Sequence, residues 1–138
     1  MRQATEKRAQ EDSEEAARAF AEGLVEAFGN AVNAVVLYGS VAAESAGEGS
    51  DVDVLVLTEA DHPDRSDVID LADSVDFSTG YESYVVPLVM SSGKLQGLYR
   101  QGFPVARAIL SEGVSIYDDG TFKRIREASF AAGGRNAN

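Results

Sequence analysis

Hydrophobic positions along the chain follow a helical period first and strand-like runs afterwards. In residues 9–28 apolar side chains recur at the spacing of one helix face, and Gly29-Asn30 follows as a helix end. The expected stripe comprises Phe20, Leu24, Ala27 and Phe28. We therefore expect a first helix that packs one face against the rest of the domain.

Four shorter apolar runs predict β-strands, and helical segments lie between and after them. The strands are expected at residues 31–38, 51–58, 83–90 and 114–117, and the helices at 66–76, 91–100, 104–111 and 121–131. Ser91 can cap the helix that follows it, and Pro104 suits the first turn of the next one. This alternation predicts an α/β (α+β) fold, with a small mixed sheet of about four strands flanked by helices.

A chain of 138 residues has the size of one domain and leaves little room for a second one of ordinary size. We expect the domain to span residues 1–131. Residues 132–138, which include Gly133-Gly134, are expected to form a flexible tail.

Two aspartates at the start of the second strand carry the first chemical signal. Because side chains alternate along a strand, Asp51 and Asp53 should point to one face and Val52 to the other. Two adjacent carboxylates repel, and each raises the pKa of the other unless a cation lies between them. Mg²⁺ favours one or two carboxylates together with water and substrate phosphates. The pair therefore predicts a divalent-metal site.

Gly39-Ser40, at the end of the first strand, carries the second signal. Without a Cβ, Gly39 lets a phosphate approach the backbone, while Ser40 offers a hydroxyl and an amide. If residues 41–44 open a helix, its first amides would face the same phosphate. The alternatives are that Gly39-Ser40 is an ordinary turn and that Asp51 and Asp53 are a solvated acidic pair. Asp53, however, precedes the apolar run 54–57, where two acids without a cation are costly.

Together these residues carry a family resemblance. Gly39-Ser40, ten residues, then Asp51-x-Asp53 resembles the GSx10DxD motif of the minimal nucleotidyltransferases, small members of the DNA polymerase β-like superfamily. Residues 84–91 and 102–117 resemble the later strand and the closing segment of that family. The resemblance implies the family's fold, with Asp51 and Asp53 as catalytic ligands of one or two Mg²⁺ ions. It also implies that Gly39 and Ser40 bind the phosphates of a nucleoside triphosphate, with ATP as the substrate.

The later strand departs from the family pattern. The superfamily carries a third carboxylate there, whereas residues 85–89 contain no acid. Glu82, at the entrance of that strand, is a candidate substitute, and a solvated strand end is the alternative. Pro87 lacks an amide donor and predicts an edge strand or a bulge.

The resemblance also implies a partner. Minimal nucleotidyltransferases are commonly one half of a two-gene system whose other half is an all-helical HEPN protein, often a ribonuclease toxin. By analogy, this chain would be the antitoxin and would transfer AMP from ATP to a tyrosine hydroxyl of the toxin. The alternative is a catalytically weak or inactive binding module that neutralises its partner by complex formation. Transfer to a small molecule is less favoured, since no acceptor domain is expected. Homo- and hetero-oligomers both remain open.

The composition of the chain limits the classes of molecule that it is expected to bind. The net charge of −11 argues against direct binding of nucleic acids, whose phosphates attract Lys and Arg. Dispersed acids and scarce lysine suggest a halophilic, haloarchaeal host, with an ordinary acidic domain as the alternative. The chain has no cysteine and no apolar run of membrane-spanning length, so we expect a cytoplasmic protein without membrane contact. No site role is assigned to His62, Arg65, Lys94 or Arg100.

Overall fold

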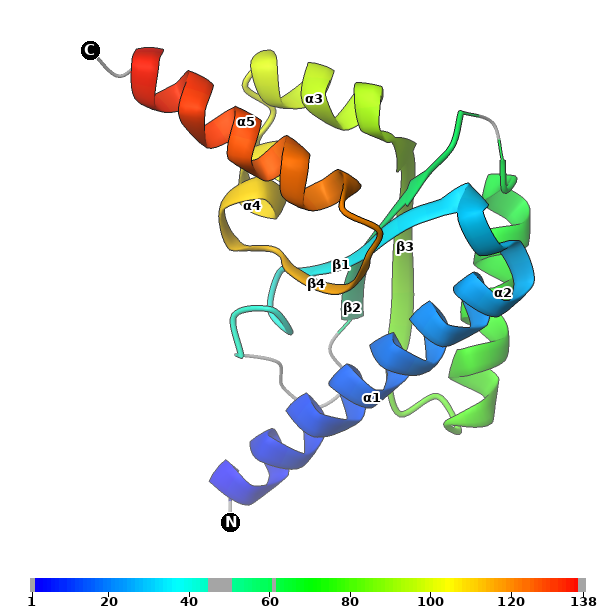
Figure 1. The fold of residues 1–138 in the computed structure, drawn as a ribbon. Helices are drawn as coiled ribbons and strands as arrows, with labels where there is room; N and C mark the ends of the chain where they lie inside the picture. Colours follow the sequence, from blue (N-terminus) through cyan, green and yellow to red (C-terminus); the bar gives the residue numbers. More distant parts are fainter. Residues whose placement is uncertain (1, 45–50, 61, 137–138) are drawn as a thin grey trace.

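The computed structural model describes residues 2–44, 51–60 and 62–136, and shows a mixed sheet between two layers of helices (Figure 1). The elements in chain order are α1 (Arg2–Phe28), the short 3-10 helix η1 (Gly29–Ala31), β1 (Val32–Tyr38), β2 (Asp51–Thr58), α2 (Arg65–Ser78), β3 (Tyr84–Ser91), α3 (Ser92–Arg100), α4 (Pro104–Glu112), β4 (Val114–Asp118) and α5 (Thr121–Asn136). The four described strands lie in the order β3-β2-β1-β4. Strands β2 and β3 are parallel, and the other two pairs are antiparallel. The predicted fold class is thus confirmed.

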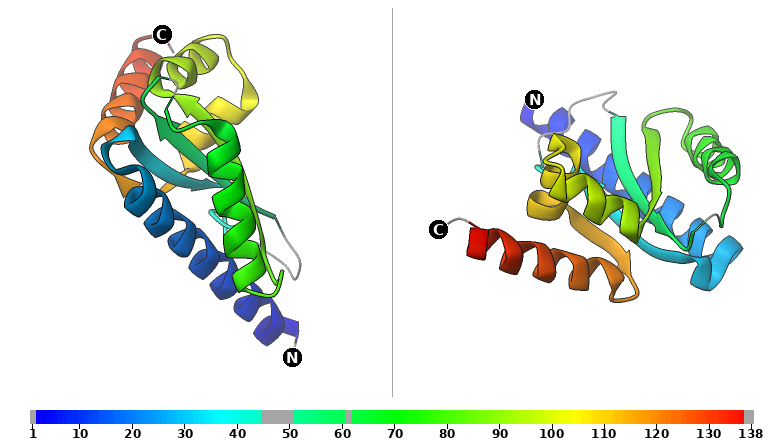
Figure 2. Two further views of the ribbon diagram at one scale, coloured as in Figure 1. Left: turned by 90° about the vertical axis from the view of Figure 1, so that its right-hand side faces the viewer. Right: turned by 90° about the horizontal axis from the view of Figure 1, so that it is seen from above.

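Each face of the sheet has its own hydrophobic core. On one face α1 and α2 pack against β-strand residues such as Val35, Val54 and Val56. On the other face α3, α4 and α5 pack against residues such as Val36 and Leu55. Figure 2 shows the two helical layers on either side of the strands. The alternation along each strand therefore decides which layer a side chain meets.

Strands β1 and β2 form the buried centre of the sheet. Residues 32–37 of β1 and 54–58 of β2 are all buried, as expected for strands covered on both faces. β3 is an edge strand, which confirms the interpretation of Pro87, since a missing donor is tolerated at an edge. The Ser91 hydroxyl accepts a hydrogen bond from the Lys94 amide at 3.2 Å and caps α3 as predicted.

Both terminal helices are longer than the sequence predicts. α1 begins at Arg2 instead of residue 9, and its last turn packs through Phe28 while Ala27 is exposed. α5 continues to Asn136 instead of ending at Ala131. Glycine weakens a helix by only about 1 kcal/mol relative to alanine, and no proline interrupts this segment. A flexible tail remains a prediction; residues 137–138 lie outside the described part of the chain.

No helix in the described part of the chain has the length and apolar character needed to cross a membrane.

Candidate metal and nucleotide site

The end of β1 and the start of β2 bring the two halves of the motif into contact. In the antiparallel register Tyr38 lies opposite Asp53, so Gly39 comes next to the aspartate. A Cβ placed on Gly39 would lie 2.6 Å from Oδ2 of Asp53, closer than real Cβ contacts allow. Gly39 also has a φ of +75°, a left-handed conformation that favours glycine. Only a glycine can therefore sit against this carboxylate without displacing it.

The two aspartates are arranged as the strand alternation predicts. Val52 between them is fully buried against the α1 and α2 layer. Asp51 and Asp53 therefore point to the opposite face, the one that α3, α4 and α5 cover further along the sheet. Asp51 is exposed and Asp53 is partly buried. Both carboxylates thus lie on one face at the open end of β2.

The charge around Asp53 is unbalanced. Burial raises the pKa of Asp53 above the ordinary value of an aspartate, and the negative charge of Asp51 raises it further. Burial also raises the pKa of the Tyr38 hydroxyl, with a second contribution from Asp53. Among the described residues neither a hydrogen bond nor a basic side chain offsets this rise, and no group of three or more His, Asp or Glu side chains gathers here. A divalent cation would supply the missing positive charge, so the donor set fits Mg²⁺.

The segment after Gly39 is anchored to the opposite layer. The amide of Ala43 donates to the carbonyl of Gly39 at 3.1 Å, and the carbonyl of buried Val41 accepts from Nε2 of Gln10 on α1 at 2.7 Å. Residues 41–44 do not open a helix, so the condition under which helix amides would face the phosphate is not met. They form a single turn, because Glu44 with a φ of 56° leaves the right-handed helical region. Residues 45–50 lie outside the described ranges.

Ser40 is partly buried at the start of this turn, directly after Gly39. The structure therefore brings three of the predicted site residues, Gly39, Ser40 and Asp53, to one corner of the sheet, with Asp51 two positions along the same strand. Their roles in metal and phosphate binding remain predictions.

Strand β3 places two largely apolar side chains beside the aspartates. In the parallel register Asp51 pairs with Tyr84 and Asp53 pairs with Val86. Paired residues share a face, so Tyr84 and Val86 flank the aspartates. Their exposed fractions are 46% and 42%, which makes this side of the site open and apolar. Glu82 is exposed and precedes the strand, where it lines a separate hollow with Asp12 of α1.

Sequence reasoning gave Tyr38 and Val86 no role at the site. Their signal is positional: Tyr38 directly precedes Gly39, and Val86 falls opposite Asp53 once the strand register is known. His62 lies beyond the other end of β2, where it is exposed and packs edge-on against Phe28 at 6.1 Å. This exposed position away from the aspartates agrees with the lack of a predicted site role for His62.

Comparison with known proteins identifies what this arrangement resembles. The family described as "Nucleotidyltransferase domain" matches residues 17–96, more than half of the chain. A solved structure of a toxin-antitoxin with AMP-PNP is 16% identical, with a TM-score of 0.55 over 86% of this chain and 87% of that one. A structure of the toxin-antitoxin MntA-HepT is 15% identical, with a TM-score of 0.50 over 86% and 85%. At these identities the likeness concerns the fold. No curated protein matches the chain.

Proposed function

Because this chain belongs to the nucleotidyltransferase domain family and has the polymerase β-like fold, we propose that it is an Mg²⁺-dependent protein adenylyltransferase. It would transfer AMP from ATP to the hydroxyl of a tyrosine in a HEPN-type helical partner. It would thereby act as the antitoxin of that partner. The observation that carries the proposal is the 2.6 Å approach between the Cβ position of Gly39 and Oδ2 of Asp53. It unites the glycine-serine turn and the acidic pair in one site.

Each residue has a defined task in this proposal. Asp51 and Asp53 would hold Mg²⁺, which supplies charge stabilisation for the attacking and leaving oxygens. The backbone at Gly39 and the hydroxyl of Ser40 would bind the phosphates. The acceptor hydroxyl oxygen would form a bond to the α-phosphorus while the bond from that phosphorus to the leaving oxygen breaks. Pyrophosphate would depart, and the hydroxyl proton would pass to water. The protein contributes mainly position and electrostatics, as expected for phosphoryl transfer.

The partner is inferred from two features. Both solved structures named above are toxin-antitoxin complexes by their descriptions, and one of them was obtained with AMP-PNP. In addition, the side of the site formed by Tyr84 and Val86 is exposed and apolar, which suits an acceptor that is itself a protein surface.

A second candidate function rests on Val86. Because a valine faces Asp53 where a third carboxylate would stand, no β3 acid can take the proton from the acceptor hydroxyl. The chain would then be a binding module that neutralises its partner by complex formation, with nucleotide binding retained or lost.

Labelled ATP, Mg²⁺ and the product of the neighbouring gene distinguish the two functions. The enzyme labels the partner, and the Asp51→Ala/Asp53→Ala variant does not. Asp70→Ala/Asp73→Ala, which removes two exposed acids from α2, is the matched control and should label normally. An unlabelled partner that is nevertheless neutralised by both variants would establish the binding module and exclude the enzyme.

A further inference from the structure

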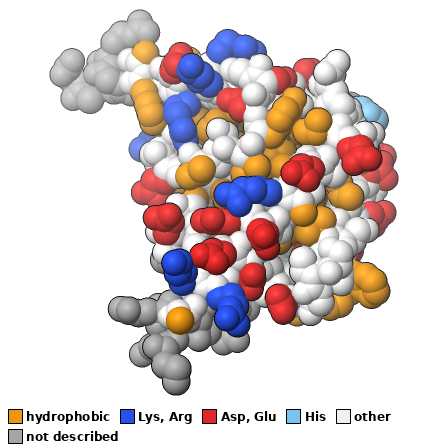
Figure 3. All heavy atoms as spheres, turned by 60° about the horizontal axis from the view of Figure 1, so that its bottom comes forward, with side chains coloured by type: hydrophobic (Ala, Val, Ile, Leu, Met, Phe, Trp, Pro, Cys, Tyr) orange, Lys and Arg blue, Asp and Glu red, His pale blue; other side chains and the backbone are white. Residues whose placement is uncertain are grey.

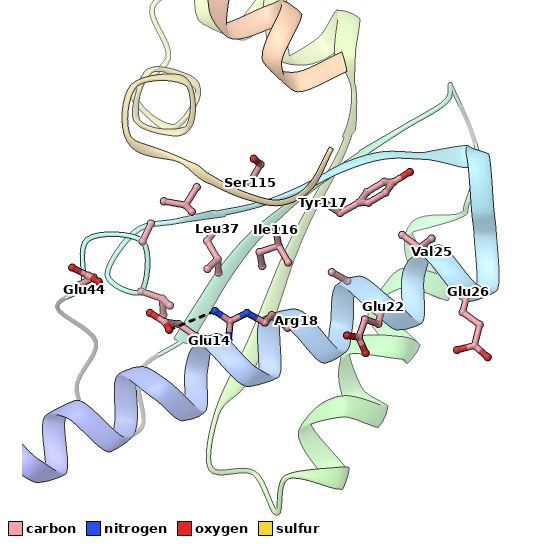
Figure 4. A pocket seen from close by; sticks show the side chains of 14 residues that line it. Glu14, Arg18, Glu22, Val25, Glu26, Leu37, Glu44, Ser115, Ile116 and Tyr117 are labelled. Carbon is pink, nitrogen blue, oxygen red and sulfur yellow. Dashed lines mark ion pairs between the residues drawn. The ribbon is translucent and has the colours of Figure 1, made fainter. Parts of the chain in front are cut away.

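A sizeable hollow lies on the other face of the sheet from Asp53. It is a groove of about 860 Å³ between α1 and β4, and Figure 4 shows its lining side chains. Leu37, Val41, Val25 and Ile116 form an apolar floor, contributed by β1, the turn after it, α1 and β4. A groove of this size and character can hold several side chains of a partner.

The groove exists because α1 does not cover the edge of the sheet. Ile116 and Tyr117 of β4 only partly join the core that α1 forms with the central strands. β4 is the outermost strand on its side of the sheet, and Val114 at its start has an exposed fraction of 49%. Apolar surface along this edge is therefore left for another molecule to cover.

The rim of the groove is acidic. Glu14, Glu22, Glu26 and Glu44 surround the floor, against the single cation Arg18. Arg18 forms an ion pair with Glu14 at 3.9 Å. In the view from below, acidic side chains gather on this side of the molecule beside exposed hydrophobic ones (Figure 3). A second copy of this chain, with its net charge of −11, would meet like charge here.

The shape of β4 favours a helix over an added strand. The register between β1 and β4 shifts between Val35 and Val36, which pair with Tyr117 and Ser115 and leave Ile116 as an extra residue. A bulge of this kind bends an edge strand and disfavours pairing with another chain. An amphipathic helix needs no edge hydrogen bonds, since its apolar stripe lies in a groove.

We propose that the groove between α1 and β4 docks an amphipathic helix of the partner protein, with an apolar stripe on the floor and Lys or Arg residues facing the glutamates. The proposal rests on the proposed function only in taking the helical partner as the source of this helix. The docked helix would touch Val41, Ala42 and Glu44, the segment that directly follows Gly39-Ser40. It would therefore support the phosphate-binding turn from behind.

Charge reversal on α1 tests this site at low salt. Glu22→Lys/Glu26→Lys changes two exposed rim residues, and Glu11→Lys/Glu15→Lys makes the same change at the same spacing on exposed positions of α1 outside the groove. We expect the rim variant to bind the purified partner at least about tenfold more weakly and the control to change less than about threefold. Melting curves of both variants verify folding.

The two proposals fail in different ways in this experiment. Equal affinity of the rim variant and the control overturns the groove, even if the wild-type protein labels the partner. Selective weakening of the rim variant without any labelling supports the groove and overturns the enzyme. A partner that does not bind the wild-type chain at all overturns both.

Discussion

Two carboxylates, buried Asp76 and partly buried Asp53, lie on opposite sides of the β2–β3 pair and differ in the groups that surround them. Asp76, at the end of α2, has an exposed fraction of 6%, and its Oδ1 accepts a hydrogen bond from the amide of Val85 at 2.9 Å. The pKa of Asp76 is raised, because burial and, to a smaller extent, the negative charge of Asp73 outweigh this hydrogen bond, which lowers it. Burial also raises the pKa of Asp53, but there the second contribution is repulsion from Asp51. Asp76 thus has a backbone donor that offsets part of the cost of burial, whereas Asp53 has no such donor among the described residues.

The difference separates a structural acid from a candidate site. A buried carboxylate that accepts a backbone hydrogen bond fixes the connection between α2 and β3 and needs no further ligand. A carboxylate that faces another carboxylate and a glycine backbone is stabilised only when a cation arrives. The direction of the pKa shift alone would not have distinguished Asp53 from Asp76, since burial raises the pKa of both.

The sharpest contrast is expected in activity. Asp53→Asn should reduce AMP transfer by at least about a thousandfold, roughly 4 kcal/mol in transition-state stabilisation, because a metal ligand is lost. Asp76→Asn should leave the rate of the folded protein near wild type. The rate of partner labelling measures both, and an active Asp53→Asn variant would remove the catalytic role of Asp53.

For the free energy of unfolding, we expect the opposite order: substitution of Asp76 should matter more than substitution of Asp53. Asp76→Ala is expected to lower the free energy of unfolding by about 1–3 kcal/mol, because the buried amide of Val85 loses its acceptor. Asp53→Ala is expected to cause no loss, since it removes a repulsive charge. Urea denaturation of the two variants provides the measurement. Equal destabilisation would mean that Asp53, too, is a structural residue.

Replacing Gly39 tests the contact between the two halves of the motif. Gly39→Ala should lower the free energy of unfolding by about 1–2 kcal/mol through its positive φ, and further through the clash with Oδ2 of Asp53. Gly29→Ala is the matched control: Gly29 has a φ of +55°, but no atom lies within 4 Å of its Cβ position. The excess cost of Gly39→Ala should disappear when Asp53→Ala is also present. An excess that persists would place the strain elsewhere.

The smallest expected effect is a pH dependence. Since the pKa of Asp53 is raised on folding, the native protein holds this proton more tightly than the unfolded chain does. Stability should therefore fall as pH rises from the unfolded value of about 3.9 through the folded pKa, and the deficit should persist at neutral pH.

Asp53→Asn should lack this part of the fall, whereas the similar contribution of Asp76 remains in both proteins. Melting temperatures of the wild type and the variant, measured without Mg²⁺, give the comparison. The pH range is about 3–7, because it includes the ordinary pKa of an aspartate and values above it. Parallel curves would show that Asp53 is not perturbed by folding.

Much of the fold could be predicted because its signals are local. The strand at 51–58, the Ser91 cap and Pro104 at the first turn of α4 each depend on a few adjacent residues. The end of α5 was missed because two glycines weaken a helix without ending it. A halophilic host remains a prediction from composition.

The site could be predicted only in part, because its contacts join distant segments. The motif indicated Gly39 and Asp53, but their contact depends on the antiparallel register of β1 and β2. The position of Val86 opposite Asp53 depends on parallel pairing across an intervening helix. The hydrogen bond between Asp76 and the next strand could not be predicted either, because an aspartate near a helix end is common and has no fixed partner.

Calorimetric titration of ATP into the wild-type chain and the Asp51→Ala/Asp53→Ala variant, with Mg²⁺ and with a chelator, tests the central claim most directly. If the carboxylates hold the metal and the turn at Gly39-Ser40 holds the phosphates, ATP should bind the wild type only with Mg²⁺. The variant should then lose at least about tenfold in affinity. Binding that is equal in both proteins, or unchanged by the chelator, would contradict the assignment of this corner of the sheet as a metal and nucleotide site.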